Sequence, residues 1–142
     1  MQSSAIRKLI IALACTGACS AAQADVVIVV AANNPVGNMS KDQIAQIFTG
    51  KAVAFPDGRK AVPIEQGPTS PTRSEFHVKV TGKDAAQLKA YWSKVIFSGA
   101  GQPPREVGSA DEMRKAVSSD ANAIGYLEKS QIDSSLKVIL TP

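Results

Sequence analysis

The stretch Val26-Val27-Ile28-Val29-Val30-Ala31 is an unbroken apolar run in which five of six residues are β-branched. Such a run is typical of a strand buried on both faces, because a strand with one solvated face alternates apolar and polar side chains. Strands of this kind occur mainly where helices cover a sheet from both sides. The stretch therefore predicts an inner strand of an α/β domain.

Helices are predicted downstream of this strand by capping signals and by apolar periodicity. Ser40 with Gln43, and Ser109 with Glu112, have the spacing of a capping box, in which two side chains satisfy the free amides of a helix start. Asp84 is the predicted cap of the clearest helix. Its apolar residues repeat with helical period and are predicted to pack in the core; they are Leu88, Tyr91, Trp92, Val95 and Ile96.

Further strands are predicted at residues 53–55, 61–64, 123–127 and 136–140. The first two flank a Pro-Asp-Gly turn, which favours a hairpin. Strands that alternate with helices indicate a layered α/β domain.

Residues 1–24 have the pattern of a secretory signal peptide. Arg7 and Lys8 precede the apolar run 9–14, and Ala22-Gln23-Ala24 is an A-x-A cleavage pattern. A membrane anchor is the alternative, but a helix needs about 20 apolar residues to span a bilayer, and this run is far shorter. The sequence therefore predicts export and a single domain at 25–142.

The predicted leader changes the charge and the cysteine count. The 142 residues carry 16 bases and 12 acids, and removal of two bases with the leader lowers the net charge from +4 to +2. That charge is too small to favour nucleic acid as a partner. Cys15 and Cys19 both lie in the leader, so no disulfide or thiolate site is expected beyond it. Lipid attachment at Cys19 is an alternative, because residues 16–19 resemble a lipobox.

The side chains best suited to bind a ligand lie between Gln66 and Arg73, where a predicted strand is followed by a predicted helix. Ser70 fits the N-cap position and Pro71 fits the first helical position. The backbone amides that follow point out of the helix start, where their partial positive charge favours an anion. The hydroxyls of Ser70 and Thr72 can donate to that anion, and Arg73 offers a planar fork of donors. The alternative is that Ser70 only caps the helix and that Arg73 is solvated.

The sequence gives little support for a metal site or for hydrolase activity. His77 is the only histidine, which excludes a multi-histidine metal site. It is predicted to be a surface residue of the helix, and the alternative is that it lines the same patch as Arg73, four residues before it. A hydrolase is a distant alternative, since no nucleophile-elbow pattern such as G-x-S-x-G occurs. The sequence therefore predicts a protein that is not an enzyme, with no cofactor and no metal.

Three segments, in order, resemble motifs of the phosphate-binding proteins of phosphate ABC transporters. They are residues 40–51, the Ser70-Pro71-Thr72-Arg73 segment and residues 123–126. The second lies where that family has its Ser-Gly-Thr phosphate loop. The Gln-Pro-Pro-Arg-Glu stretch at 102–106 is similar to that of short, single-lobe members. The resemblance covers roughly residues 26–140.

The resemblance implies one lobe of a type II periplasmic binding protein, with a mixed sheet flanked by helices. It implies a periplasmic module, linked to phosphate ABC transport, that binds inorganic phosphate or a similar oxyanion. The site residues would be Ser70, Thr72 and Arg73, with Gln66 beside them. Relatives hold phosphate between two lobes, so a homodimer would complete the cleft of a single lobe. The alternative is an accessory domain without phosphate binding that docks on an envelope transporter, receptor or sensor.

Overall fold

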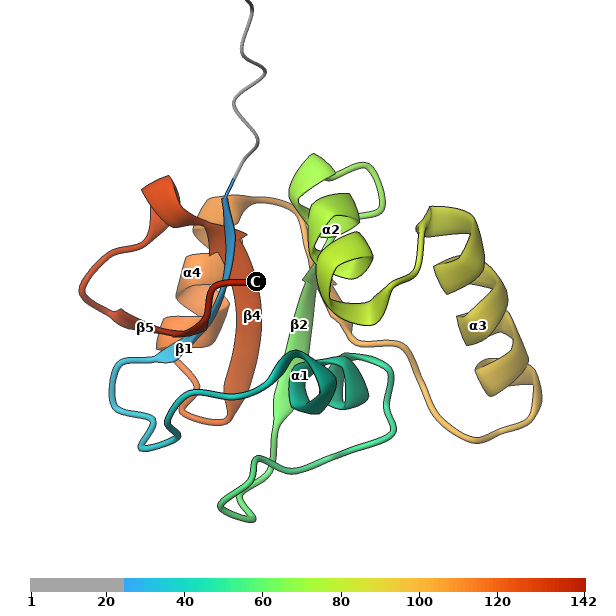
Figure 1. The fold of residues 1–142 in the computed structure, drawn as a ribbon, viewed down its shortest axis with the longest axis horizontal. Coiled ribbons are helices and arrows are strands. Elements are labelled where there is room, and N and C mark those ends of the chain that lie inside the picture. The colour runs from blue at the N-terminus through green and yellow to red at the C-terminus, as the bar shows by residue number, and fades with distance from the viewer. Residues whose placement is uncertain (1–24) are drawn as a thin grey trace, which may run out of the picture.

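Strand β1 (Val26–Ala31) lies inside a five-stranded mixed sheet and is buried along its whole length, as its sequence predicts. The structure, a computed structural model, describes residues 25–142 (Figure 1). The predicted signal peptide, with Cys15 and Cys19, lies outside the described residues. The strand order is β3-β2-β4-β1-β5. Strand β1 pairs antiparallel with β4 and β5, whereas β2 pairs parallel with β3 and β4.

The other strands are β2 (Val62–Gln66), β3 (Arg105–Val107), β4 (Ala123–Glu128) and β5 (Leu136–Leu140). The helices are α1 (Lys41–Phe48), α2 (Pro71–Phe76), α3 (Ala85–Phe97) and α4 (Ala110–Ser118). Helix α2 continues without a break into one π-helical turn, η1 (His77–Thr81), and a short 3-10 turn, η2 (Lys129–Gln131), links β4 to β5. Within residues 25–142, no helix combines the length and apolar character needed to cross a bilayer.

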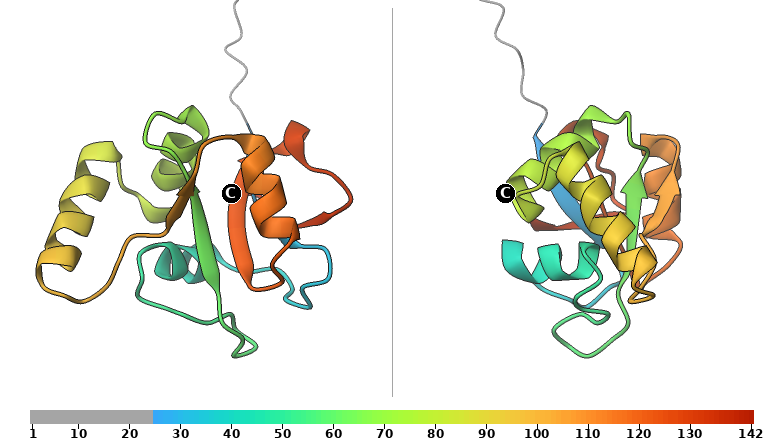
Figure 2. Two further views of the ribbon diagram at one scale, coloured as in Figure 1. Left: turned by 180° about the vertical axis from the view of Figure 1, so that it is seen from behind. Right: turned by 90° about the vertical axis from the view of Figure 1, so that its right-hand side faces the viewer.

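Helices cover both faces of the sheet, which explains why β1 carries no polar residue. Figure 2 shows α1 and α2 on one side of the sheet and α4 on the other. Alternate β1 side chains enter two separate cores, with Val26, Ile28 and Val30 beneath α1 and α2 and with Val27 and Val29 beneath α4. The three layers make this an α/β fold, as predicted.

The predicted helix starts at Ser40 and Asp84 are confirmed, because both form complete capping boxes. At Ser109 only half of the predicted box forms. Its hydroxyl accepts from the Glu112 amide, but the Glu112 carboxylate accepts from the Gly108 amide instead. The predicted hairpin is confirmed only as a reversal of the chain: one antiparallel bridge joins Ala54 to Lys60 around the turn, and residues 53–55 do not form a strand.

Strand β2, which contains most of the second predicted segment, pairs with β3 and β4 instead. Strand β3 has only three residues and follows a Pro-Pro pair, so the sequence analysis missed it. The two closing strands, β4 and β5, are confirmed.

Helix α3 lies to one side of the layered body (Figure 1). Its Trp92 ring lies against Gly50, and the Tyr91 hydroxyl donates to the Thr49 carbonyl, both just beyond the end of α1. The prediction that its whole apolar stripe is core is wrong, since only Leu88 and Trp92 are buried. Ile96 is 47% exposed, because the stripe is longer than the surface it packs against.

Close packing of α4 on the sheet depends on Gly125 in β4. A Cβ at this position would lie 2.5 Å from the Met113 sulfur and 2.9 Å from a Val117 methyl carbon. We expect Gly125→Ala to lower the free energy of unfolding by about 1–3 kcal/mol, because added volume strains a filled core. Gly37→Ala is the matched control, since a Cβ there meets nothing within 4 Å. Urea unfolding followed by circular dichroism measures both, and equal stabilities would contradict the packing constraint.

Candidate functional site

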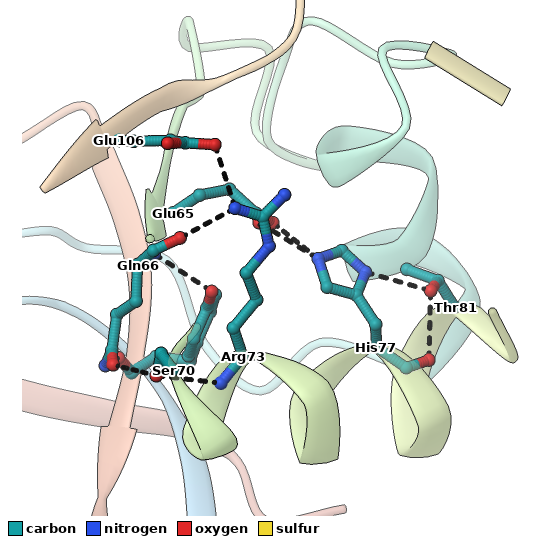
Figure 3. Close-up of polar contacts among 8 residues, drawn as sticks. Glu65, Gln66, Ser70, Arg73, His77, Thr81 and Glu106 are labelled. Carbon is teal, nitrogen blue, oxygen red and sulfur yellow. Dashed lines mark hydrogen bonds and ion pairs between the residues drawn. The ribbon is translucent and has the colours of Figure 1, made fainter. Parts of the chain in front are cut away.

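The segment from Gln66 to Arg73 forms the junction between the end of β2 and the start of α2. The Ser70 hydroxyl caps α2 by accepting from the Arg73 amide at 3.2 Å, and it donates to the Gln66 side-chain carbonyl at 2.6 Å. Pro71 occupies the first helical position, as predicted. The structure therefore brings Gln66, Ser70 and Arg73 together (Figure 3).

Gln66 is held rigidly and is only 7% exposed. Its backbone amide donates to the Tyr126 hydroxyl at 3.0 Å, and its side-chain amide donates to the Tyr126 carbonyl at 3.2 Å. Burial, reinforced by the charge of Glu65, raises the pKa of Tyr126 far above its ordinary value, so this phenol stays neutral. Gln66 thus anchors the loop to β4 and has both ends of its amide engaged.

Thr72 is turned away from this group. It is 6% exposed, and its hydroxyl donates to a carboxylate oxygen of Glu128 at 3.3 Å. Its side chain therefore contacts the end of β4 rather than the Arg73 guanidinium.

Arg73 extends from α2 across the end of β2. Its Nε forms an ion pair with Glu65 at 3.0 Å, and its Nη1 donates to Glu106 at 2.8 Å and to the Gln66 carbonyl at 2.9 Å. Burial alone would lower the pKa of Arg73, but its hydrogen bond to Glu106 and the charge of Glu65 outweigh burial and raise that pKa. Within residues 25–142, Nη2 takes part in no hydrogen bond, and Figure 3 draws no contact to it.

Two further residues of this site were missed by the sequence analysis, Glu65 and His77. Glu65 is 2% exposed and His77 3% exposed, so the prediction that His77 is a surface residue is wrong. The Nε2 atom of His77 lies 2.8 and 3.0 Å from the two Glu65 carboxylate oxygens. Glu65 therefore sits between the guanidinium and the imidazole (Figure 3).

The second ring nitrogen of His77, Nδ1, contacts the Thr81 hydroxyl. Thr81 donates its hydroxyl hydrogen to the His77 carbonyl at 2.9 Å, which leaves its oxygen to face Nδ1 at 3.0 Å. The signal for the pair was the four-residue spacing of Arg73 and His77, which places both on one helix face.

A groove adjoins the guanidinium and separates α2 and η1 from α3. It has a volume of about 550 Å³, and its lining includes Arg73, His77 and Glu106 as well as apolar residues of α3. Among residues 25–142, no group of three or more histidine, cysteine, aspartate or glutamate side chains could hold a metal ion. The site therefore offers hydrogen-bond donors, one arginine and an apolar wall.

Comparison with solved structures identifies the fold. A structure from Clostridium perfringens with bound phosphate, assigned as the substrate-binding protein of a phosphate ABC transporter, is 23% identical with a TM-score of 0.64. An ABC-type phosphate transport receptor from Vibrio cholerae is 21% identical (TM-score 0.65), and PstS from Borrelia burgdorferi is 16% identical (TM-score 0.61). Each alignment covers 81% of this chain but only 44%, 45% and 46% of the respective structure.

At these identities the likeness shows the fold. The five-stranded mixed sheet with its flanking helices matches the lobe fold of these binding proteins, so the predicted fold class is confirmed. This chain spans less than half the length of the structures it matches. No protein-family model matches the sequence, and no curated protein matches it.

The buried carboxylate of Glu65 gives a stability prediction. We expect Glu65→Ala to lower the free energy of unfolding by about 3 kcal/mol, because it removes the partner of two buried donors. The control is Glu75→Ala, which breaks the more exposed i,i+4 pair of Glu75 with Lys79 on the same helix. That change should cost about 0.5 kcal/mol or less. Urea unfolding compares the two variants, and similar small losses would show that the Glu65 contacts contribute little.

Proposed function

We propose that this protein is a non-enzymatic oxyanion-binding module whose ligand is inorganic phosphate. The observation that carries the proposal is the position of Arg73. Its guanidinium is fixed at the start of α2 by Glu65 and the Gln66 carbonyl, and its Nη2 retains its hydrogens for a ligand. A guanidinium that offers a free nitrogen from a fixed position is well suited to a phosphate oxygen.

The other site residues have distinct roles in this proposal. Ser70 and Gln66 fix the loop, so that the start of α2 keeps its position relative to Arg73. The first amides of a helix lack intrahelical acceptors, and the Thr72 amide is the first that can donate, because Pro71 has none. In this proposal Arg73 makes the main contact with the ligand and the Thr72 amide is a further donor, whereas Ser70 and Gln66 position the loop.

The names of the structural neighbours support phosphate as the ligand, since they are described as phosphate transport receptors or were solved with phosphate. A place in phosphate ABC transport and a periplasmic location belong to the same proposal. A homodimer that completes a phosphate cleft stays a prediction. Light scattering with and without phosphate measures the oligomeric state.

A second candidate is an accessory domain that binds an envelope protein and no oxyanion. The observation that favours it is that two carboxylates, Glu65 and Glu106, already neutralise Arg73. Under this candidate the Arg73 contacts are structural. Capture of an envelope transporter, receptor or sensor that is independent of phosphate would support it.

Calorimetry with phosphate and with sulfate decides between the two candidates. We expect phosphate to bind the purified protein and Arg73→Ala to weaken that binding about tenfold or more, because a charged hydrogen bond is lost. Arg73→Lys keeps the positive charge, so Glu65 keeps a charged partner. It loses the planar fork of donors and should therefore also weaken phosphate binding. The control is Arg105→Ala, an exposed arginine that does not line the groove.

Arg105→Ala should leave the affinity unchanged. Absence of heat with either anion in the unsubstituted protein would remove the ligand-binding proposal and leave the accessory domain. Circular dichroism of each variant shows whether a lost signal reflects a lost contact or a lost fold.

Glu106 provides a second test, in which the substitution should raise rather than lower the affinity for phosphate. Its side chain is 49% exposed and lies 2.8 Å from the Arg73 Nη1, so it competes with an incoming anion for the guanidinium. We expect Glu106→Gln to raise phosphate affinity by about two- to fivefold at low salt, because a partly solvated charge pair is worth about 1 kcal/mol or less. The gain should shrink in high salt through screening. Weaker phosphate binding in this variant would show that Glu106 assists the ligand.

A further inference from the structure

The groove between η1 and α3 is mainly apolar and is open to solvent. Its volume of about 550 Å³ falls within the range of pockets that hold small organic ligands. Val78 from η1 faces Leu88, Trp92 and Ile96 from α3 across it, with Pro103 at one side. Val78 is 61% exposed and Ile96 47% exposed, so the apolar surface is accessible.

The charges at the rim of the groove favour an anionic occupant. The acids there are engaged, since Glu106 accepts from Arg73 and Asp84 caps α3 through the Gln87 amide. The bases Lys83 and Lys89 also line the groove, and within residues 25–142 neither pairs with a carboxylate. Lys83 lies over the Tyr91 ring at 5.3 Å.

We infer that the groove binds the apolar group of an organic phosphate, a phosphate monoester with a short alkyl or aryl chain. Its phosphate would contact Arg73, and its chain would lie along Val78, Trp92 and Ile96. The inference rests on the proposed function for the Arg73 contact and adds the class of ligand. Inorganic phosphate would fill only the polar end of the groove.

The position of Trp92 allows a direct test. It is the only tryptophan of the chain and lines the groove, so its fluorescence emission reports what enters. The probes are n-butyl phosphate, inorganic phosphate and n-butanol, with calorimetry run in parallel. A fully buried methylene is worth about fourfold in affinity, so burial of about two carbons of the butyl chain should make n-butyl phosphate bind about tenfold tighter than inorganic phosphate and should shift the Trp92 emission.

Two neighbouring residues of α3 provide matched variants. Ile96 lines the groove, whereas Phe97 is 96% exposed and does not line it. Ile96→Ser should weaken n-butyl phosphate about threefold or more without affecting inorganic phosphate, because buried apolar contact is lost. Phe97→Ser should leave both affinities unchanged. Neither residue lies in a core cluster, so both variants should fold.

The possible outcomes separate this inference from the proposed function. Equal affinities for n-butyl phosphate and inorganic phosphate, both reduced by Arg73→Ala, would overturn the inference and leave the proposed function intact. Binding of n-butyl phosphate that survives Arg73→Ala, or that n-butanol matches, would overturn the combined site. If neither phosphate binds, both proposals fail. Binding of n-butyl phosphate alone would support the organic ligand and remove inorganic phosphate.

Discussion

The burial of the Glu65 carboxylate is the constraint on which the rest of the site depends. A carboxylate that is 2% exposed costs several kcal/mol unless donors surround it. Arg73 and His77 supply them from consecutive turns of one helix, and Thr81 holds the ring from the other side. Because Glu65 belongs to β2 and its partners to α2 and η1, the ion pairs lock this helix onto the end of the strand.

The same constraint fixes two nitrogens of the Arg73 guanidinium, Nε and Nη1, and leaves Nη2 available. Glu65 and the Gln66 carbonyl hold Nε and Nη1 from buried positions, whereas Glu106 reaches Nη1 from a half-exposed one. In the proposed function, an anionic ligand would compete with Glu106 for the guanidinium and would leave the Glu65 pair intact. Hydrogen bonds to an anion strengthen as water leaves, so the groove lined by Arg73 is where the proposed ligand would bind most strongly.

Local signals predicted most of the fold, whereas the site depends on contacts that local signals do not report. The run from Val26 to Ala31 predicted a strand covered on both sides, and Ser70 with Pro71 predicted the start of α2 correctly. Glu65, by contrast, is a charged residue after an apolar strand, which in sequence is indistinguishable from a solvated strand end. Its burial follows from the pairing of β2 with two strands and the packing of α2 beside it, which are properties of the assembled fold.

Helix α3 shows how an error of prediction can locate a functional surface. Its apolar stripe was expected to be core, but only Leu88 and Trp92 find partners, and Ile96 remains at the wall of an open groove. Contiguous apolar surface of this kind on a soluble domain commonly marks a binding site. Here the exposed apolar residues of α3 line the same groove as the Arg73 guanidinium, which has one nitrogen without a hydrogen-bond partner among residues 25–142. The organic phosphate proposed above would cover this wall and accept a hydrogen bond from the free nitrogen.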